Sequence, residues 1–72
     1  MKTLLRKIGG QFLQAPDLWT NNLQDALDFK SMRRAIDFAE NAGYRNMELA
    51  FLFDNPHRLE TARVDTLLGM EM

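Results

Sequence analysis

The sequence predicts a small α+β domain with two layers: an antiparallel sheet of three or four strands and one main helix packed on one of its faces. Three observations predict this fold. Paired glycines divide residues 3–15 into two apolar runs, residues 31–43 carry an apolar stripe with helical spacing, and residues 47–53 alternate as a strand does. A chain of 72 residues has room for one domain, so we expect 1–72 to fold as a single unit.

Residues 3–15 are predicted to form a β-hairpin whose turn is Gly9-Gly10. A tight turn of this length needs positive φ at both central positions, which glycine adopts without steric cost. Pairing across the turn places Arg6 opposite Leu13. The two faces of the hairpin then hold different apolar sets, of which we expect the first to face the core: Leu4, Ile8, Leu13 and Ala15 on one side, and Leu5 and Phe12 on the other.

The segment after the hairpin is expected to start with a turn at Pro16-Asp17. Further along, Asn22 is a favoured N-cap and predicts a single helical turn after it. Residues 26–29 fit a short third strand. The expected order is therefore the helical turn first and the third strand second.

Residues 31–43 contain the main helix. Ser31 is a favoured N-cap, and Gly43 suits the left-handed residue that ends many helices. Between them an apolar stripe repeats at i, i+3, i+4 and i+7, which predicts that one face of the helix packs on the sheet. The stripe consists of Met32, Ala35, Ile36, Ala39 and Ala42.

Residues 47–53 are predicted to form a strand that is apolar on both faces, which is typical of a central strand or of one whose second face is covered. The tail, 56–72, has a looser pattern. Asn55 as N-cap, Pro56 at the first helical position and Gly69 as terminator predict a C-terminal helix. Residues 62–67 also fit a strand, but we favour the helix, with its last residues, 70–72, frayed.

The order of these elements is carried by core-type residues between Leu4 and Pro56: Trp19, Thr20, Ala26, Phe29, Ser31, Ala35, Ala39 and the strand end Phe53-Asp54-Asn55-Pro56. In this pattern the chain resembles small uncharacterised bacterial proteins of β-β-β-α-β arrangement. The resemblance implies that arrangement and a bacterial or phage source. It carries over no catalytic residue.

Composition excludes several kinds of site. The chain has no cysteine, which rules out disulfides and thiolate zinc sites, and its one histidine, His57, follows a proline at the start of the tail, where a surface position is expected. Apolar runs are too short for a membrane span, and the charged start has no signal-peptide core after it. We therefore expect a cytoplasmic protein.

Motifs that carry chemistry are also missing from the sequence. Gly9-Gly10 lacks the spacing of a phosphate-binding loop. Two carboxylate pairs at i, i+3 are interpreted as solvated faces: Asp25 with Asp28, and Asp37 with Glu40. No nucleophile, general base or metal set is recognisable. We predict a protein that is not an enzyme and that binds no cofactor, metal or small molecule.

One helix covers one face of a sheet, so the second face of the predicted sheet has no certain cover. It carries Leu5, Phe12 and either the Leu52 or the Phe51 side of the strand at 47–53, and the tail, water or a partner must cover it. Contiguous exposed apolar surface marks interaction sites. We therefore predict a protein-interaction module that self-associates or binds a protein partner, and a homodimer is one expected form.

The alternative function is a small nucleic-acid-binding regulator. Its contacts would be four basic residues at or near the main helix: Lys30, Arg33, Arg34 and Arg45. Basic side chains at a helix start oppose the helix dipole, a conflict that a bound phosphate would offset. The net charge of -1 argues against nucleic acid as the partner.

Overall fold

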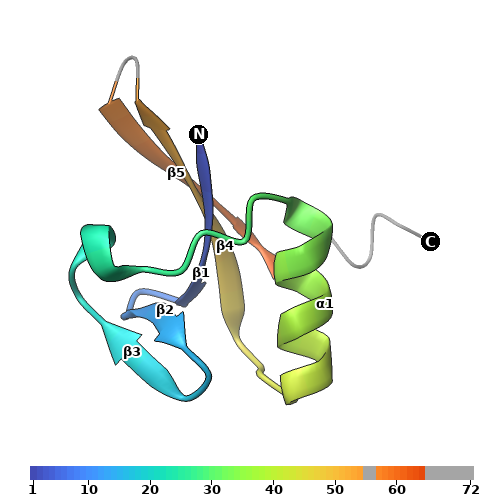
Figure 1. The fold of residues 1–72 in the computed structure, drawn as a ribbon. Helices are drawn as coiled ribbons and strands as arrows, with labels where there is room; N and C mark the ends of the chain where they lie inside the picture. Colours follow the sequence, from blue (N-terminus) through green and yellow to red (C-terminus); the bar gives the residue numbers. More distant parts are fainter. Residues whose placement is uncertain (55–56, 65–72) are drawn as a thin grey trace.

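A five-stranded sheet and one α-helix form the architecture of the computed structural model, which describes residues 1–54 and 57–64 (Figure 1). Along the chain the elements are β1 (Lys2–Lys7), β2 (Phe12–Ala15), β3 (Leu18–Thr20), the 3-10 turn η1 (Leu23–Asp25), α1 (Met32–Ala42), β4 (Met47–Asp54) and β5 (His57–Arg63). The strands lie in the order β3-β2-β1-β4-β5, and every neighbouring pair is antiparallel. The predicted α+β class is confirmed, but the sheet has five strands rather than three or four.

Residues 57–63, which the sequence predicts as part of a C-terminal helix, form β5 instead, whereas the predicted cap Asn55 and first position Pro56 lie outside the described residues. β4 and β5 pair without a break from Asp54↔His57 to Glu48↔Arg63. The eight residues of β4 present a long row of backbone groups on each side, and β5 satisfies one of these rows. This pairing outweighs a loosely fitting helical stripe. The rest of the predicted helix, beyond Val64, and the frayed end at 70–72 lie outside the described residues.

The predicted hairpin of β1 and β2 is present, but its register is shifted by one residue. Arg6 lies opposite Phe12 rather than Leu13. Because side chains alternate along a strand, this shift exchanges the partners on both faces. Leu13 now shares a face with Leu5, and Phe12 shares the opposite face with Leu4.

The cause of the shift is the turn itself. The Gly10 N–H donates to the Lys7 carbonyl at 2.8 Å, so the turn runs over four residues from Lys7 to Gly10. Gly9, the third of them, has a φ of 67°, while Gly10 does not have positive φ. This is the requirement of a type II turn and not of the tight turn that two left-handed glycines would make. Gln11 is left to pair with Lys7, which moves every later pair by one position.

Strand β3 precedes the helical turn instead of following it. Pro16-Asp17 forms the predicted turn, and the pair Ala15↔Leu18 closes a two-residue loop. Asp17 has a φ of 60°, the positive φ that a type II turn needs after proline. Since the loop is this short, the chain turns back at once and pairs with β2. η1 begins only afterwards, capped by Asn22 as predicted.

Residues 26–30, part of which was expected to be a strand, join the sheet by separate hydrogen bonds. The Leu27 N–H donates to the Leu13 carbonyl of β2 at 2.9 Å, and the Phe29 N–H donates to the Thr3 carbonyl of β1 at 2.8 Å. This crossing segment, 26–30, therefore lies between the two strands. It carries the chain from η1 on one side of the molecule to α1 on the other (Figure 1).

The main helix has the predicted ends. The Ser31 hydroxyl accepts a backbone N–H of the first turn at 3.1 Å. Gly43 is left-handed at a φ of 72°, with its N–H donating to the Glu40 carbonyl at 3.1 Å. The Tyr44 N–H donates to the Ala39 carbonyl at 3.0 Å, which completes a Schellman motif and satisfies the last carbonyls of α1.

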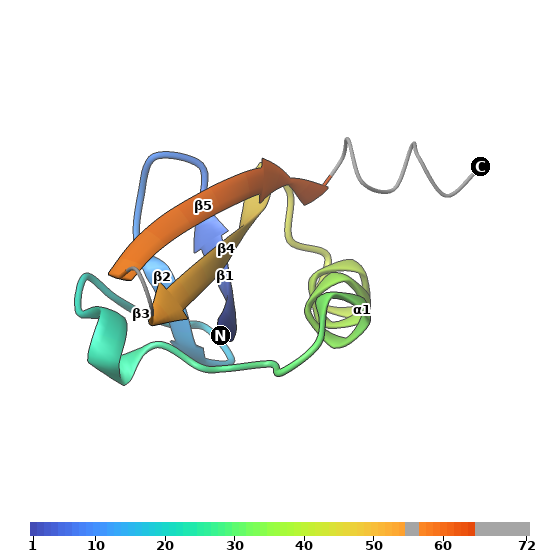
Figure 2. The ribbon, with the colours of Figure 1, turned by 90° about the horizontal axis from the view of Figure 1, so that it is seen from above.

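Apolar side chains are buried on both faces of the sheet, with α1 and η1 on opposite sides of it (Figure 2). The core between α1 and the sheet consists of Ala35, Ile36 and Ala39 of the helix with Leu5, Leu13, Met47, Leu49 and Val64. The other face buries Leu4, Phe12 and Ala50, against which Leu23 and Ala26 pack. The strand predicted over 47–53 is present as β4, an inner strand of the sheet, and of the two expected arrangements it has the covered second face, because η1 and its flanks pack there.

The packing of α1 generates a test. Ala39 is 1% exposed and faces the sheet, so Ala39→Asp would bury a carboxylate with no partner. An unpaired buried charge costs about 3–5 kcal/mol, a large part of the stability of a domain this small. We expect the variant to be unfolded at 25 °C by circular dichroism. Asn41→Asp, which adds the same charge at an exposed position of α1, should fold; a cooperative melt of Ala39→Asp near that of the parent would contradict the packing.

Candidate functional site

The three residues predicted to form an interaction surface are buried. Leu5, Phe12 and Leu52 are 0%, 8% and 6% exposed. Leu5 lies under α1, whereas Phe12 lies on the opposite face beneath η1. The predicted surface is therefore corrected: these side chains are core, because the register shift separates the first two and the η1 segment covers the second face. Leu52 is buried, but its cross-strand neighbour, Leu59 of β5, is partly exposed at the surface.

Strand β5 forms one outer edge of the sheet in the described part of the chain. Leu59 is 36% exposed beside Leu52. On the other face of the strand, Arg58 and Glu60 form an exposed ion pair at 3.4 Å, and the Arg58 guanidinium lies 4.7 Å from the centre of the Phe53 ring. Along the sequence of this edge strand, Leu59 is therefore flanked by a basic and an acidic residue, whose side chains lie on the opposite face.

The four basic residues of the nucleic-acid alternative do not form one cluster. Lys30, Arg33 and Arg34 are exposed at the start of α1, where Arg33 pairs with Asp37 at 3.9 Å. Arg45 follows the other end of the helix. Eleven residues at 1.5 Å each separate the two ends by about 16 Å. A single phosphate-binding patch made of all four is therefore not present.

A pocket of about 270 Å³ lies beside the aromatic residues at the end of α1. Its lining residues, which define the Trp19 pocket, are Lys7, Ile8, Trp19, Tyr44, Arg45, Asn46 and Met47. The Trp19 and Tyr44 ring centres are 5.4 Å apart and tilted, and the Lys7 ammonium lies 4.3 Å from the centre of the Trp19 ring. Two cations and two aromatic rings thus meet at one hollow.

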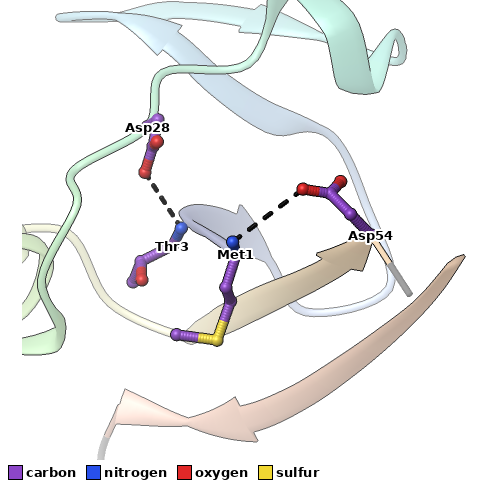
Figure 3. A network of polar contacts seen from close by, with 4 residues as sticks. All are labelled: Met1, Thr3, Asp28 and Asp54. Atoms are coloured by element: carbon purple, nitrogen blue, oxygen red, sulfur yellow. Dashed lines mark hydrogen bonds and ion pairs between the residues drawn. The ribbon is translucent and has the colours of Figure 1, made fainter. Parts of the chain in front are cut away.

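A wider pocket of about 440 Å³ lies at the start of β1, lined by Lys2, Asn21, Asn22, Leu23, Gln24, Leu52 and Asp54. The amino terminus of Met1 lies beside it, 3.9 Å from the Asp54 carboxylate (Figure 3). Both partners are exposed, so this ion pair contributes little to stability. The rim of this pocket contains amide groups and charges of both signs, so it favours no particular ligand.

Asp28 is a candidate for an acid with a role in chemistry, because perturbed carboxylates gather at functional sites. Its Oδ1 accepts the Thr3 N–H at 3.0 Å (Figure 3) and also the Lys30 N–H at 2.9 Å. Burial alone would raise the pKa of Asp28, but these two hydrogen bonds and the positive charges of Lys30 and Lys2 outweigh it and lower the pKa below its ordinary value. A carboxylate that is held ionised by backbone donors is a structural anchor rather than a proton donor.

Residues 1–54 and 57–64 contain neither a group of metal-ligating side chains nor a membrane-spanning helix. No three His, Cys, Asp or Glu side chains there are grouped so that they could hold a metal ion. No helix in the same part of the chain is long and apolar enough to cross a membrane.

The β5 edge and the Trp19 pocket are the features that sequence reasoning missed. The alternation of a charged residue, leucine and an oppositely charged residue at Arg58-Leu59-Glu60 is typical of a strand. It was passed over because Asn55 and Gly69 on either side indicated the ends of a helix. The pocket had no local signal, because its residues come from the end of β1, from β3 and from the loop after α1.

Comparison of the chain with protein-family models, with curated protein sequences and with solved structures finds no match.

Asp28 gives a prediction about stability. Thr3 is 2% exposed, so Asp28→Ala would leave the buried Thr3 N–H without an acceptor. This loss should lower the free energy of unfolding by about 1–3 kcal/mol. Asp28→Asn keeps the oxygen and should lose less. Urea unfolding of each variant at neutral pH measures these differences, with Asp25→Asn as the exposed control.

The same variants predict a pH dependence. A lowered folded pKa means that the charge of Asp28 stabilises the fold above the unfolded pKa of about 4, and that this contribution disappears as the pH falls through the folded value. The advantage of the parent over Asp28→Asn should therefore shrink between pH 5 and pH 2, by urea unfolding at steps across that range. An advantage that is the same at both ends would show that the charge does not contribute.

Proposed function

We propose that this chain is a non-enzymatic protein-interaction module that pairs with a second copy of itself along the outer edge of β5. The observation that carries the proposal is the order of side chains on that edge. Leu59 stands between Arg58 and Glu60, which point to the opposite face and carry opposite charges. An outer strand also offers a row of backbone donors and acceptors that a further strand can use.

This order complements itself when two copies pair antiparallel. A two-fold axis at Leu59 sets that residue opposite its own copy, and it sets Arg58 of each copy opposite Glu60 of the other. Two cross-strand ion pairs result, each contributing about 0.2–1 kcal/mol. A shift of one residue along the strand would lose both pairs, so the charges favour one register.

The apolar face of β5 supports the same register. Leu52 of β4 lies beside Leu59, so pairing at the two-fold axis would align four leucines in one row across two copies. Leu59 is the exposed member of this row, and since about a third of it is exposed, burying the rest contributes about 0.5–1 kcal/mol per copy. The edge combines an apolar centre with complementary charges, as a specific pairing surface requires.

Sedimentation equilibrium of the full chain tests the proposal, with charge reversal as the probe. Glu60→Arg and Arg58→Glu each turn two attractive pairs into two repulsive ones, so each should weaken association about 10- to 30-fold. Glu40→Arg makes the same charge change on the exposed face of α1 and should leave association unchanged.

Mixing the two β5 variants gives the sharpest result. One variant carries two cations on this stretch and the other two carboxylates, so an equimolar mixture should form heterodimers with the affinity of the parent. A parent that stays monomeric at millimolar concentration would overturn the proposal. So would single variants that associate as the parent does.

A further inference from the structure

We infer that the Trp19 pocket binds an acidic peptide, taking one large apolar side chain of the peptide against Trp19, Tyr44 and Met47 while neighbouring carboxylates contact Lys7 and Arg45. This site is separate from the β5 edge, because none of its lining residues lies on β5. The inference rests on the size of the hollow, the charge of its rim and the way its walls are held.

The size of the pocket suits one side chain. At about 270 Å³ it is smaller than the roughly 300–1,000 Å³ of sites that enclose a drug-sized molecule. Its lining combines the buried Met47 with the rings of Trp19 and Tyr44 and the partly exposed Ile8. An apolar group placed there would leave water for an apolar surface on several sides.

The rim of the pocket is positive. Lys7 and Arg45 are both exposed, no carboxylate belongs to the lining, and Arg45 makes no ion pair within the part of the chain that the structure describes. The Lys7 ammonium lies over the Trp19 ring, where a ligand carboxylate can reach it without displacing it. The two cations come from different elements, so they suit carboxylates on separate residues of an extended ligand.

The walls of the pocket are held before any ligand arrives. The Tyr44 hydroxyl accepts the Asp17 N–H at 3.1 Å and donates to the Asp17 carboxylate at 3.0 Å, so its polar end is satisfied and its ring is fixed. The Ile8 N–H donates to the Asn46 carbonyl at 3.1 Å, which ties the two sides of the rim together. A preformed site loses less entropy on binding.

An extended peptide fits this place better than a nucleic acid does. Trp19 lies on β3, the outer strand at the other edge of the described sheet, beside which an extended segment can lie. Stacking of a base favours a flat, open platform, but Lys7 occupies one face of the Trp19 ring, and the tilt of 56° between Trp19 and Tyr44 leaves no parallel slot for a base.

Fluorescence titration provides the test, because Trp19 is the only tryptophan of the chain and reports directly from the pocket. The probe is the peptide Asp-Glu-Leu-Glu-Asp, with blocked ends, added to the full-length protein. We expect a saturable change in Trp19 emission. Replacing the leucine of the peptide by serine should weaken binding more than tenfold, and replacing its four acids by amides should weaken it and remove its salt dependence.

Variants of the protein supply the matched controls. Arg45→Ser should weaken binding about threefold, and adding Lys7→Gln about tenfold, whereas Arg34→Ser removes the same charge from α1 and should have no effect. An emission that does not change up to millimolar peptide would overturn the inference. So would equal binding of the serine peptide, or tighter binding of oligothymidylate at the same residues, which would assign the pocket to nucleic acid.

Discussion

The backbone of β1 needs partners at Thr3, a buried residue, and β2 does not supply them there. The crossing segment does, since the Phe29 N–H bonds to the Thr3 carbonyl and the Asp28 carboxylate accepts the Thr3 N–H. Buried backbone groups must be paired, so this segment has to lie between β1 and β2. The position of η1 before it and of α1 after it follows from that single constraint.

Both faces of the inner strands can be apolar for the same reason. A small domain with one helix covers one face of its sheet, but here the chain passes from one face to the other, and each side receives a cover. Neighbours along a strand, such as Leu4 and Leu5 of β1 or Leu49 and Ala50 of β4, are all fully buried on opposite faces. The short chain therefore buries apolar side chains on both faces of β1 and β4 without a second long helix.

The parts of this fold that the sequence predicted are those that depend on local physics. Ser31 and Gly43 end α1 through contacts within a few residues of themselves, and Asn22 caps η1 in the same way. The hairpin register is also set locally, but it was missed because the sequence does not show which of two adjacent glycines takes positive φ. β5 was not local, since the unpaired edge of β4 decided between strand and helix. Asp28 looked like one of a solvated pair, and only the tertiary fold brings its carboxylate to Thr3, twenty-five positions away.

The strand order has a consequence for valency. β3 and β5 lie at opposite edges of the sheet, so two copies joined through β5 would form ten strands with β3 at both outer ends. At about 4.8 Å per strand, nine spacings measure roughly 43 Å along the sheet from one Trp19 to the other. A ligand with two acidic segments at a matching distance would bind both Trp19 pockets at once. The second binding event would then be intramolecular, so the overall affinity would exceed that of either pocket alone.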